Sequence, residues 1–220
     1  RGQARDYDHW RQLGNPGWGW DDVLPYFKQH EVFVHGADEM HGAGGEWRSD
    51  RQRLHWPILD DFRDAANAAG LAKVTDFNRG DNHGVGYFHV TQRGGIRLNT
   101  AKAFLKSVRN RPNLRVQSGA QAKRVLMENR RATGVEMRVN GVDQVAMARG
   151  EVVLAAGAIG SPHLLELSGI GRPENLQALG IDVRHALPGL GENLQDHLQL
   201  RLIYRLKDAL TLNTLSASLW

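Results

Sequence analysis

Hydrophobic residues recur at helical spacing in the first part of the chain. Residues 21–31, DDVLPYFKQHE, carry apolar side chains three and four positions apart after an aspartate that can cap, which predicts a helix. A second predicted helix opens at Pro57 and runs through the alanine-rich DDFRDAANAA to Gly70, which stands where helices commonly stop.

Glycine-rich stretches separate these helices. Residues 35–56 and 71–98 show little periodicity and are dotted with glycine, so both are predicted to be mainly loops. A third helix is predicted over residues 101–110, AKAFLKSVRN, with Asn99 or Thr100 as its cap, and a following proline prevents its continuation.

The pattern changes to short strand-like runs in the second half of the chain. The predicted strands are residues 114–116, 122–127, 133–139 and 142–148. Asn140 and Gly141 separate the last two runs, and Asn-Gly is a strong signal for a two-residue hairpin. The segment is therefore predicted to form a meander of short antiparallel strands.

A continuous apolar run follows the meander. Residues 151–156, EVVLAA, do not alternate with polar residues, which is typical of a strand buried on both faces of a parallel sheet. Ser161 is predicted to cap a helix that begins at Pro162 and ends at Gly169. A glycine at position 157, between strand and helix, would allow a ligand to approach the backbone, or would only allow a tight crossing without a ligand.

Two further elements are predicted before the chain loses clear signals. Residues 173–179, PENLQAL, start with proline and precede Gly180, which predicts a short helix. Residues 181–187, IDVRHAL, are strand-like, and Pro188-Gly189 predicts a turn.

Composition limits the function without defining it. The chain has 28 basic and 24 acidic residues without a block of like charges, so nucleic-acid binding is disfavoured. The absence of cysteine excludes disulfides, thiolate nucleophiles and cysteine-ligated metals. No apolar stretch approaches the roughly 20 residues that span a bilayer.

Polar residues give no local catalytic motif. The ten histidines include no H-E-x-x-H arrangement, so no metal site is predicted. Ser161 and Ser168 lack a G-x-S-x-G context, which favours capping or packing over nucleophilic catalysis. Arg93 and Arg97, in RGGIR, face a substrate, an acidic partner or, most simply, solvent.

The chain resembles the glucose-methanol-choline (GMC) family of flavin oxidoreductases along nearly its whole length. Residues 157–171, GAIGSPHLLELSGIG, match that family's second signature throughout. Further matching stretches occur in family order: RGxxxDYDxW at 1–10, GWGWDDVLPYFKQHE at 17–31, HGAGGEW at 41–47, NLRV at 113–116 and LPGLGENLQDH at 187–197.

This resemblance implies an FAD-dependent enzyme of the choline- or alcohol-dehydrogenase-like branch, which oxidises a primary alcohol to an aldehyde by hydride transfer to flavin. The alcohol would be the small-molecule partner, and the electron acceptor stays undetermined between oxygen, a quinone and a protein carrier. The residues that the resemblance assigns to the cofactor are Ala122, Ala155, Ala156, Gly157 and Asn193.

The resemblance also implies an α/β fold of mixed type. Residues 1–197 would belong to a Rossmann-like FAD-binding domain with a β-meander, and residues 198–220 would begin a substrate domain with an antiparallel sheet. The family's G-x-G-x-x-G segment would precede Arg1 and its catalytic histidine would follow Trp220, so the chain is expected to be an inactive internal segment of a longer protein.

Two other functions stay open at this point. The same family includes flavin-bearing hydroxynitrile lyases, and a non-catalytic binding module would keep the fold without the chemistry. A cytoplasmic or inner-membrane-associated location is the expectation from the branch.

Overall fold

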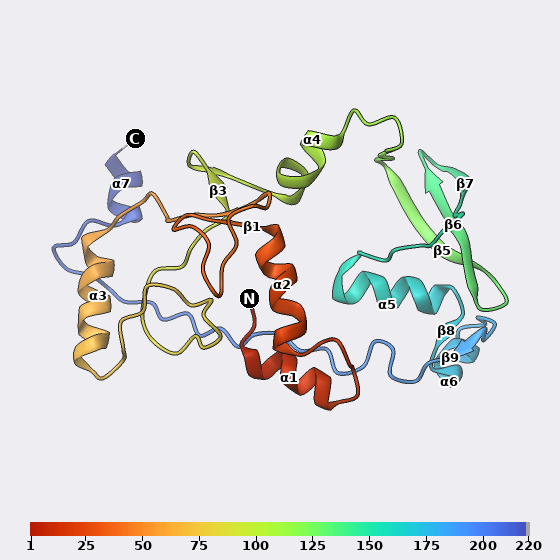
Figure 1. The fold of residues 1–220 in the computed structure, drawn as a ribbon, viewed down its shortest axis with the longest axis horizontal. Coiled ribbons are helices and arrows are strands. Elements are labelled where there is room, and N and C mark those ends of the chain that lie inside the picture. The colour runs from red at the N-terminus through yellow and green to blue at the C-terminus, as the bar shows by residue number, and fades with distance from the viewer. Residues whose placement is uncertain (219–220) are drawn as a thin grey trace. The chain divides into compact units, whose positions relative to one another are not determined.

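The computed structural model describes residues 1–218, which divide into two compact units (Figure 1). One unit is Arg1–Leu114 together with the chain from Tyr204 onward, and the other is Arg115–Ile203. Both contain helices and small sheets, in agreement with the predicted mixed α/β class. The proposed boundary between residues 1–197 and 198–220 stays a prediction, and the last two residues of the latter segment lie outside the described chain.

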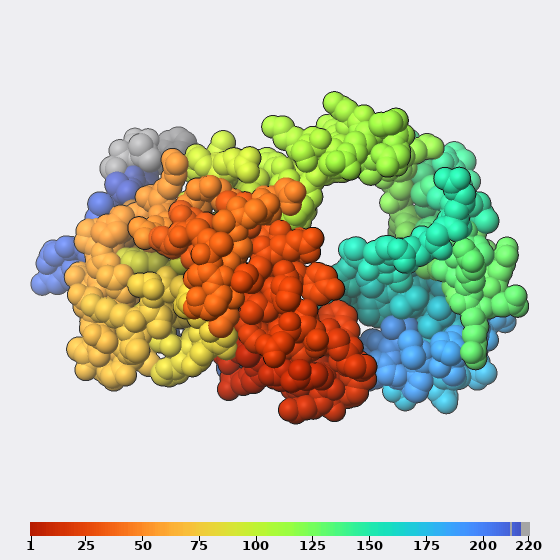
Figure 2. All heavy atoms as spheres, viewed as in Figure 1, coloured from red at the N-terminus to blue at the C-terminus, as the bar shows by residue number. Residues whose placement is uncertain are grey.

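Two helices open the first unit. Helix α1 (Ala4–Gln12) was not predicted, whereas α2 (Trp20–His30) lies within one residue of its predicted position. The Tyr7 ring joins the helices, because its centroid lies 5.2–5.9 Å from three other rings: Trp10, Trp20 and Phe27. In Figure 2 the red atoms of the first 30 residues form a surface that continues into the orange atoms of the residues after them.

The stretch predicted as a loop over residues 35–56 contains one strand. Strand β1 (Glu31–Phe33) follows α2 directly and pairs in parallel with β2 (Trp47–Ser49). Each strand has three residues, which is too short for alternation to be visible in the sequence. The loop prediction is therefore wrong for β2 and correct for most of the remainder.

Two glycines between these strands allow the backbone to pack on the end of α2. A Cβ built on Gly42 would lie 1.8 Å from the carbonyl oxygen of Lys28, and one on Gly45 would lie 2.0 Å from that of His30. Any larger residue would force the loop away from the helix, so these glycines of the HGAGG stretch are explained by close packing.

The predicted second helix and a hairpin complete the middle of this unit. Helix α3 (Pro57–Ala68) begins at its predicted proline and is followed by Gly70 with a φ of +100°, as expected for a helix stop. Strands β3 (Gln92–Arg93) and β4 (Ile96–Arg97) form an antiparallel hairpin. Its turn, Gly94-Gly95, has φ values of +63° and +83°, which glycine adopts without strain.

The third predicted helix is present in a modified form. Its first part is the π-helix η1 (Ala101–Leu105), and its second part is α4 (Lys106–Val108). The Asn99 carboxamide oxygen accepts a hydrogen bond from the Lys102 N–H at 2.9 Å, which confirms Asn99 as a cap.

The second unit contains the predicted meander. Strands β5 (Ala120–Glu128), β6 (Arg131–Val139) and β7 (Val142–Met147) pair antiparallel in that order. The turn at Asn140 and Gly141 has φ values of +50° and +85°, the combination that a type I′ hairpin requires. The strand propensity of these runs and the Asn-Gly turn predict the same arrangement, and the predicted meander is confirmed.

Two other strand predictions are wrong. Residues 114–116 and residues 151–156 pair with no strand among residues 1–218. Val116 and Val153 are correspondingly exposed, at 58% and 77%. An apolar run shows that its side chains favour burial, but it does not show which segment supplies the hydrogen-bonding partner.

The helix after residue 156 starts earlier than predicted. Helix α5 spans Gly157–Leu167, so Pro162 lies inside the helix and Ser161 is not its N-cap. Residues 157–160 can join the helix because the left-handed conformation of the corner is confined to Gly157, whose φ is +85°. The predicted end is correct, since Gly169 has a φ of +83°.

The predicted elements after α5 are present. Helix α6 (Pro173–Ala178) is followed by Gly180 with a φ of +69°. The strand-like run contributes β9 (His185–Ala186), which pairs in parallel with β8 (Ile170–Gly171). The Leu190 N–H donates to the Leu187 carbonyl at 3.0 Å, which closes the predicted turn.

The segment after residue 197 contains helix α7 (Leu212–Ser218) and, within the described residues, no strand. Among residues 1–218 no helix combines the length and the apolar character needed to cross a bilayer.

Candidate functional site

The corner between residues 151–155 and α5 is the site that the sequence singled out. Ala156 is the N-cap residue, with a φ of −88°, and Gly157 has a φ of +85°. The Ala156 N–H donates to the Ser161 hydroxyl at 3.0 Å, which ties the corner to the first turns of the helix. Ser161 therefore stabilises the corner from inside the helix.

The corner is open. A Cβ built on Gly157 meets no atom of the described chain within 4 Å, and Ala155, Ala156 and Gly157 are all exposed. The first N–H groups of an α-helix have no intrahelical acceptors and carry the positive end of its dipole. This geometry can accept a flat group or an anionic oxygen against the backbone.

A turn from later in the chain packs near the same part of α5. A Cβ built on Gly191 would lie 3.8 Å from the Cβ of Pro162. Arg172 holds the turn, because its Nη2 donates to the Pro188 carbonyl at 3.2 Å and to the Glu192 carboxylate at 3.1 Å. Residues 188–192 are thus fixed beside the helix that starts at the open corner.

Asn193 ends this turn in an unusual conformation. Its φ is +55°, a region that asparagine tolerates better than most residues with a side chain. Asn193 is exposed, and within the described chain its carboxamide makes no hydrogen bond. Its donors and acceptor are available to a ligand.

The register of the meander places Ala122. A β-bulge between Ala122 and Arg124 inserts one extra residue opposite β6. Ala122 pairs with Met137 and Val125 with Val135, so by alternation Ala122 shares the buried face of the sheet that Val125 occupies. Ala122 itself is exposed.

The opposite face of the meander carries a cross-strand charge network. Lys123 Nζ lies 2.6 Å from a Glu136 oxygen and 2.9 Å from an Asp143 oxygen, and Arg138 binds Asp143 through two nitrogens at 2.7 and 2.9 Å. The hydrogen bonds from Arg138 and Lys123 hold the pKa of Asp143 well below its usual range. The bulge residue Lys123 therefore turns its charge away from the face that bears Ala122.

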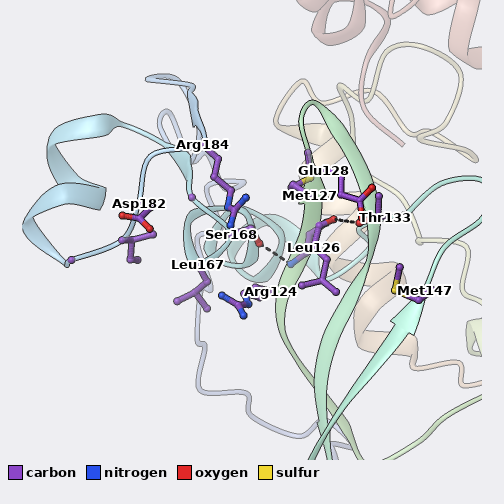
Figure 3. Close-up of a pocket in the computed structure, with 14 residues that line it drawn as sticks. Arg124, Leu126, Met127, Glu128, Thr133, Met147, Leu167, Ser168, Asp182 and Arg184 are labelled. Atoms are coloured by element: carbon purple, nitrogen blue, oxygen red, sulfur yellow. Dashed lines mark hydrogen bonds between the residues drawn. The ribbon is translucent and has the colours of Figure 1, made fainter.

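A cavity of about 510 Å³ lies at the other end of α5, as shown in Figure 3. Its lining includes Leu126 of β5, Ser168, and Asp182 and Arg184 from the segment before β9. It is thus separated from the Gly157 corner by the length of the helix. Sequence reasoning missed it because its lining residues come from segments that no local motif connects.

Sequence reasoning also missed a buried hydrogen-bonded cluster of a histidine and two carboxylates in the first unit. His41 is fully buried, and its Nδ1 and Nε2 each lie 2.8 Å from a carboxylate oxygen, of Glu31 and of Asp76. The Phe33 ring stacks on the imidazole with centroids 3.7 Å apart. The carboxylates lie 10 and 35 residues from His41, so only the histidine of the HGAGG stretch was visible as a signal.

Known proteins similar to this chain share one family. Residues 1–199 match the family described as GMC oxidoreductase. The oxygen-dependent choline dehydrogenase of Photobacterium profundum is 42% identical over 217 residues, which cover 97% of this chain and 38% of that protein. The mitochondrial choline dehydrogenase of Homo sapiens is 40% identical over 200 residues, covering 91% and 34%.

Solved structures give the same result. The pyridoxine 4-oxidase from Mesorbium loti superposes with a TM-score of 0.79 and 32% identity, covering 86% of this chain and 37% of that one. A fungal aryl-alcohol oxidase superposes with a TM-score of 0.78 and 25% identity, covering 86% and 35%. The chain thus spans less than two fifths of the length of the relatives it matches.

Proposed function

Because the chain belongs to the GMC oxidoreductase family, we propose that it forms part of an FAD-dependent enzyme that oxidises a primary alcohol to an aldehyde. The names of its relatives support this proposal, since they include choline dehydrogenases, pyridoxine 4-oxidase and an aryl-alcohol oxidase. A choline-like alcohol is the proposed substrate, because both curated relatives described above are named choline dehydrogenases.

The open corner at Gly157 is the observation that carries the proposal. A bound nucleotide cofactor needs a backbone that it can approach closely, and this corner offers a residue without a side chain, in a conformation suited to glycine, with open space where a Cβ would point. Gly157 is the first residue of an 11-residue helix, so backbone donors are available beside it. The residues present therefore fit an FAD.

The proposed cofactor residues fall into three groups with different roles. Ala155, Ala156 and Gly157 would provide the close backbone surface. Asn193 would offer its carboxamide from the turn that Arg172 holds. Ala122, an exposed residue of β5, would offer its backbone N–H and carbonyl groups. FAD, when bound, supplies the acceptor for the hydride that leaves the alcohol carbon.

The protein residues have to do the remaining work of the reaction. A general base must take the alcohol proton within hydrogen-bond reach, and we propose that this base lies outside residues 1–220. Ala155, Ala156 and Gly157 carry no group that can hold a proton, so the corner itself does not supply the base.

The test uses the full-length protein that contains this chain. Purified protein is expected to show the visible absorbance of an oxidised flavin, and choline added without oxygen is expected to bleach it. Benzyl alcohol and pyridoxine serve as comparison alcohols, and a cyanohydrin tests for lyase activity. A colourless protein, or a flavin that no alcohol reduces while the cyanohydrin is cleaved, would overturn the proposal.

A further inference from the structure

An arginine-rich surface lies around the β3–β4 hairpin in the first unit. An isolated antiparallel bridge joins Asp50 to Val90, so the stretch RSDRQR at residues 48–53 lies alongside the start of the hairpin. The side chain of Arg53 runs past the hairpin turn, because a Cβ built on Gly95 would lie 3.3 Å from its Cδ and 3.6 Å from its Nη1.

A cavity of about 520 Å³ opens beside the turn, lined by His89, Val90, Thr91, Gln92, Gly95 and Arg97. Arg97 pairs with Gln92 across the hairpin, so the two side chains share one face. Gln92 is buried and donates through its carboxamide to the Arg51 carbonyl. Arg93 pairs with Ile96 and therefore belongs to the opposite face.

The carboxylates near this surface bind other groups first. Arg48 binds Asp50 at 3.0 Å, and Asp76, which acts on His89, is hydrogen-bonded to His41. The Arg51 guanidinium donates its Nε–H to the His35 ring at 3.2 Å and forms no ion pair among residues 1–218, while the Arg51 backbone N–H donates to Asp50. Arg53 and Arg97 form no ion pair within residues 1–218, although Asp50 lies close enough to interact with the charge of Arg53.

The histidine of the cavity does not add to this charge near neutral pH. Burial lowers the pKa of His89 by more than Asp76 raises it, and the neighbouring His35, His41 and Arg51 act in the same direction as burial. His89 is therefore neutral near pH 7 and can take part in one donor and one acceptor contact. The three guanidinium groups remain as the charge that a ligand would meet.

We propose that this cavity, with Arg51, Arg53 and Arg97 around it, binds a small molecule that carries a carboxylate or phosphate group. Guanidinium groups match the planar geometry of such oxyanions with paired hydrogen bonds. The cavity volume lies in the range of roughly 300–1,000 Å³ that small-molecule sites occupy. The proposal is independent of the alcohol oxidation proposed above, and no relative's name assigns such a site.

Titration calorimetry of the FAD-replete full-length protein with citrate and with pyrophosphate tests the proposal. We expect saturable binding of at least one of the two anions at constant ionic strength. Arg97→Gln and Arg53→Gln should each weaken that binding by about tenfold, as expected for one charge-assisted hydrogen bond. Arg93→Gln is the matched control, because it removes the same charge from the opposite face of the same hairpin, and it should change the affinity by less than about twofold.

Thermal melting of each variant separates lost binding from lost folding. Arg53 makes no hydrogen bond or ion pair with the described chain, so Arg53→Gln should fold even if Arg97→Gln does not. The proposal is overturned if neither anion binds, if Arg93→Gln weakens binding as much as Arg53→Gln, or if chloride at the same ionic strength competes equally well.

Discussion

The hydroxyl oxygen of Ser168 lies 2.8 Å from the backbone nitrogen of Val125 and accepts its hydrogen bond, while the same hydroxyl donates to the Leu164 carbonyl at 2.6 Å. Ser168 is 3% exposed. One buried side chain therefore joins the end of α5 to the middle of the edge strand β5 and satisfies a backbone donor there.

Ser168→Ala is predicted to destabilise the second unit. The substitution leaves the buried N–H of Val125 without an acceptor, which costs about 1–3 kcal/mol of unfolding free energy. Thermal melting of the full-length protein checks it, with Ser107→Ala as the control, since Ser107 is exposed and donates only to a carbonyl of its own helical segment at 3.4 Å. Equal melting temperatures for the two variants would show that the Ser168 bridge contributes nothing.

His41→Ala is predicted to have a larger effect in the first unit. Both ring nitrogens contact carboxylates, so removal of the ring takes a buried hydrogen-bond partner from Glu31 and from Asp76, although Arg1 still pairs with Glu31. Leaving a buried polar group without its hydrogen-bond partner costs about 1–3 kcal/mol, and two such groups lose a partner here. Circular dichroism melts provide the measurement.

The exposed His83 serves as the comparison for His41. Its side chain makes no hydrogen bond within residues 1–218, although its backbone N–H donates to Asp81, so His83→Ala should leave the melting temperature nearly unchanged. A small effect of His41→Ala would mean that the cluster does not hold the HGAGG loop.

Arg79→Gln is predicted to remove an acid-sensitive contribution to stability. The hydrogen bond from Arg79 lowers the pKa of Asp38 from 3.8 to about 2, with help from the backbone N–H groups of Met40 and His41. A carboxylate with a depressed folded-state pKa stabilises the protein above its unfolded pKa and loses that contribution as the pH falls. The melting temperature of the native protein should therefore exceed that of the variant near pH 6, and the difference should shrink between about pH 4 and pH 2.

Exposed Arg109 makes no ion pair in the described chain, which makes Arg109→Gln a suitable control for charge alone. It should show no such pH-dependent difference. If the difference for Arg79→Gln stayed constant down to pH 2, the contribution would not come from Asp38.

Local chemistry made much of the fold predictable. Asn140-Gly141, the proline at 57 and the glycines at 70, 169 and 180 each fix a turn or a helix end through their own backbone preferences. These signals act within a few residues, so they can be recognised in the sequence without knowledge of the tertiary structure.

The errors share a different origin. Residues 151–155 carry the right side chains for a buried strand but have no partner strand in the described chain, and β1 and β2 depend on a pairing across 16 residues. The His41 cluster likewise depends on carboxylates far away in the sequence. Long-range partners determine these features, and the sequence pattern does not encode them locally.

Residues 1–220 expressed alone are predicted to bind FAD at well below one equivalent and to oxidise no alcohol. The exposed side chain of Val153 and the unpaired backbone around it indicate that the corner is not supported as it would be in a complete sheet. Flavin absorbance after dialysis against excess FAD gives the measurement. Stoichiometric flavin and alcohol-dependent bleaching in this chain would overturn the assignment of the base to another part of the protein.

Comparison of Gly157→Ala with Gly180→Ala separates the effect of backbone strain from the effect of cofactor contact at the open corner. Gly157 and Gly180 both have positive φ values, +85° and +69°, and a Cβ built on either meets no atom within 4 Å. Alanine at either position should therefore cost a similar amount of stability, about 1–2 kcal/mol, because the left-handed conformation is unfavourable for it. Gly180 ends α6, away from the corner, which makes Gly180→Ala the matched control.

The two variants should differ in flavin content. If the cofactor lies against the Gly157 backbone, the added methyl group occupies the space that the ring or its nucleotide needs, and the full-length Gly157→Ala protein should lose most of its flavin while Gly180→Ala retains it. Flavin per protein, measured by absorbance after gel filtration, is compared at equal folded fraction. Equal retention in both variants would mean that the open space at Gly157 serves no cofactor, and the proposed site would have to lie elsewhere in the protein.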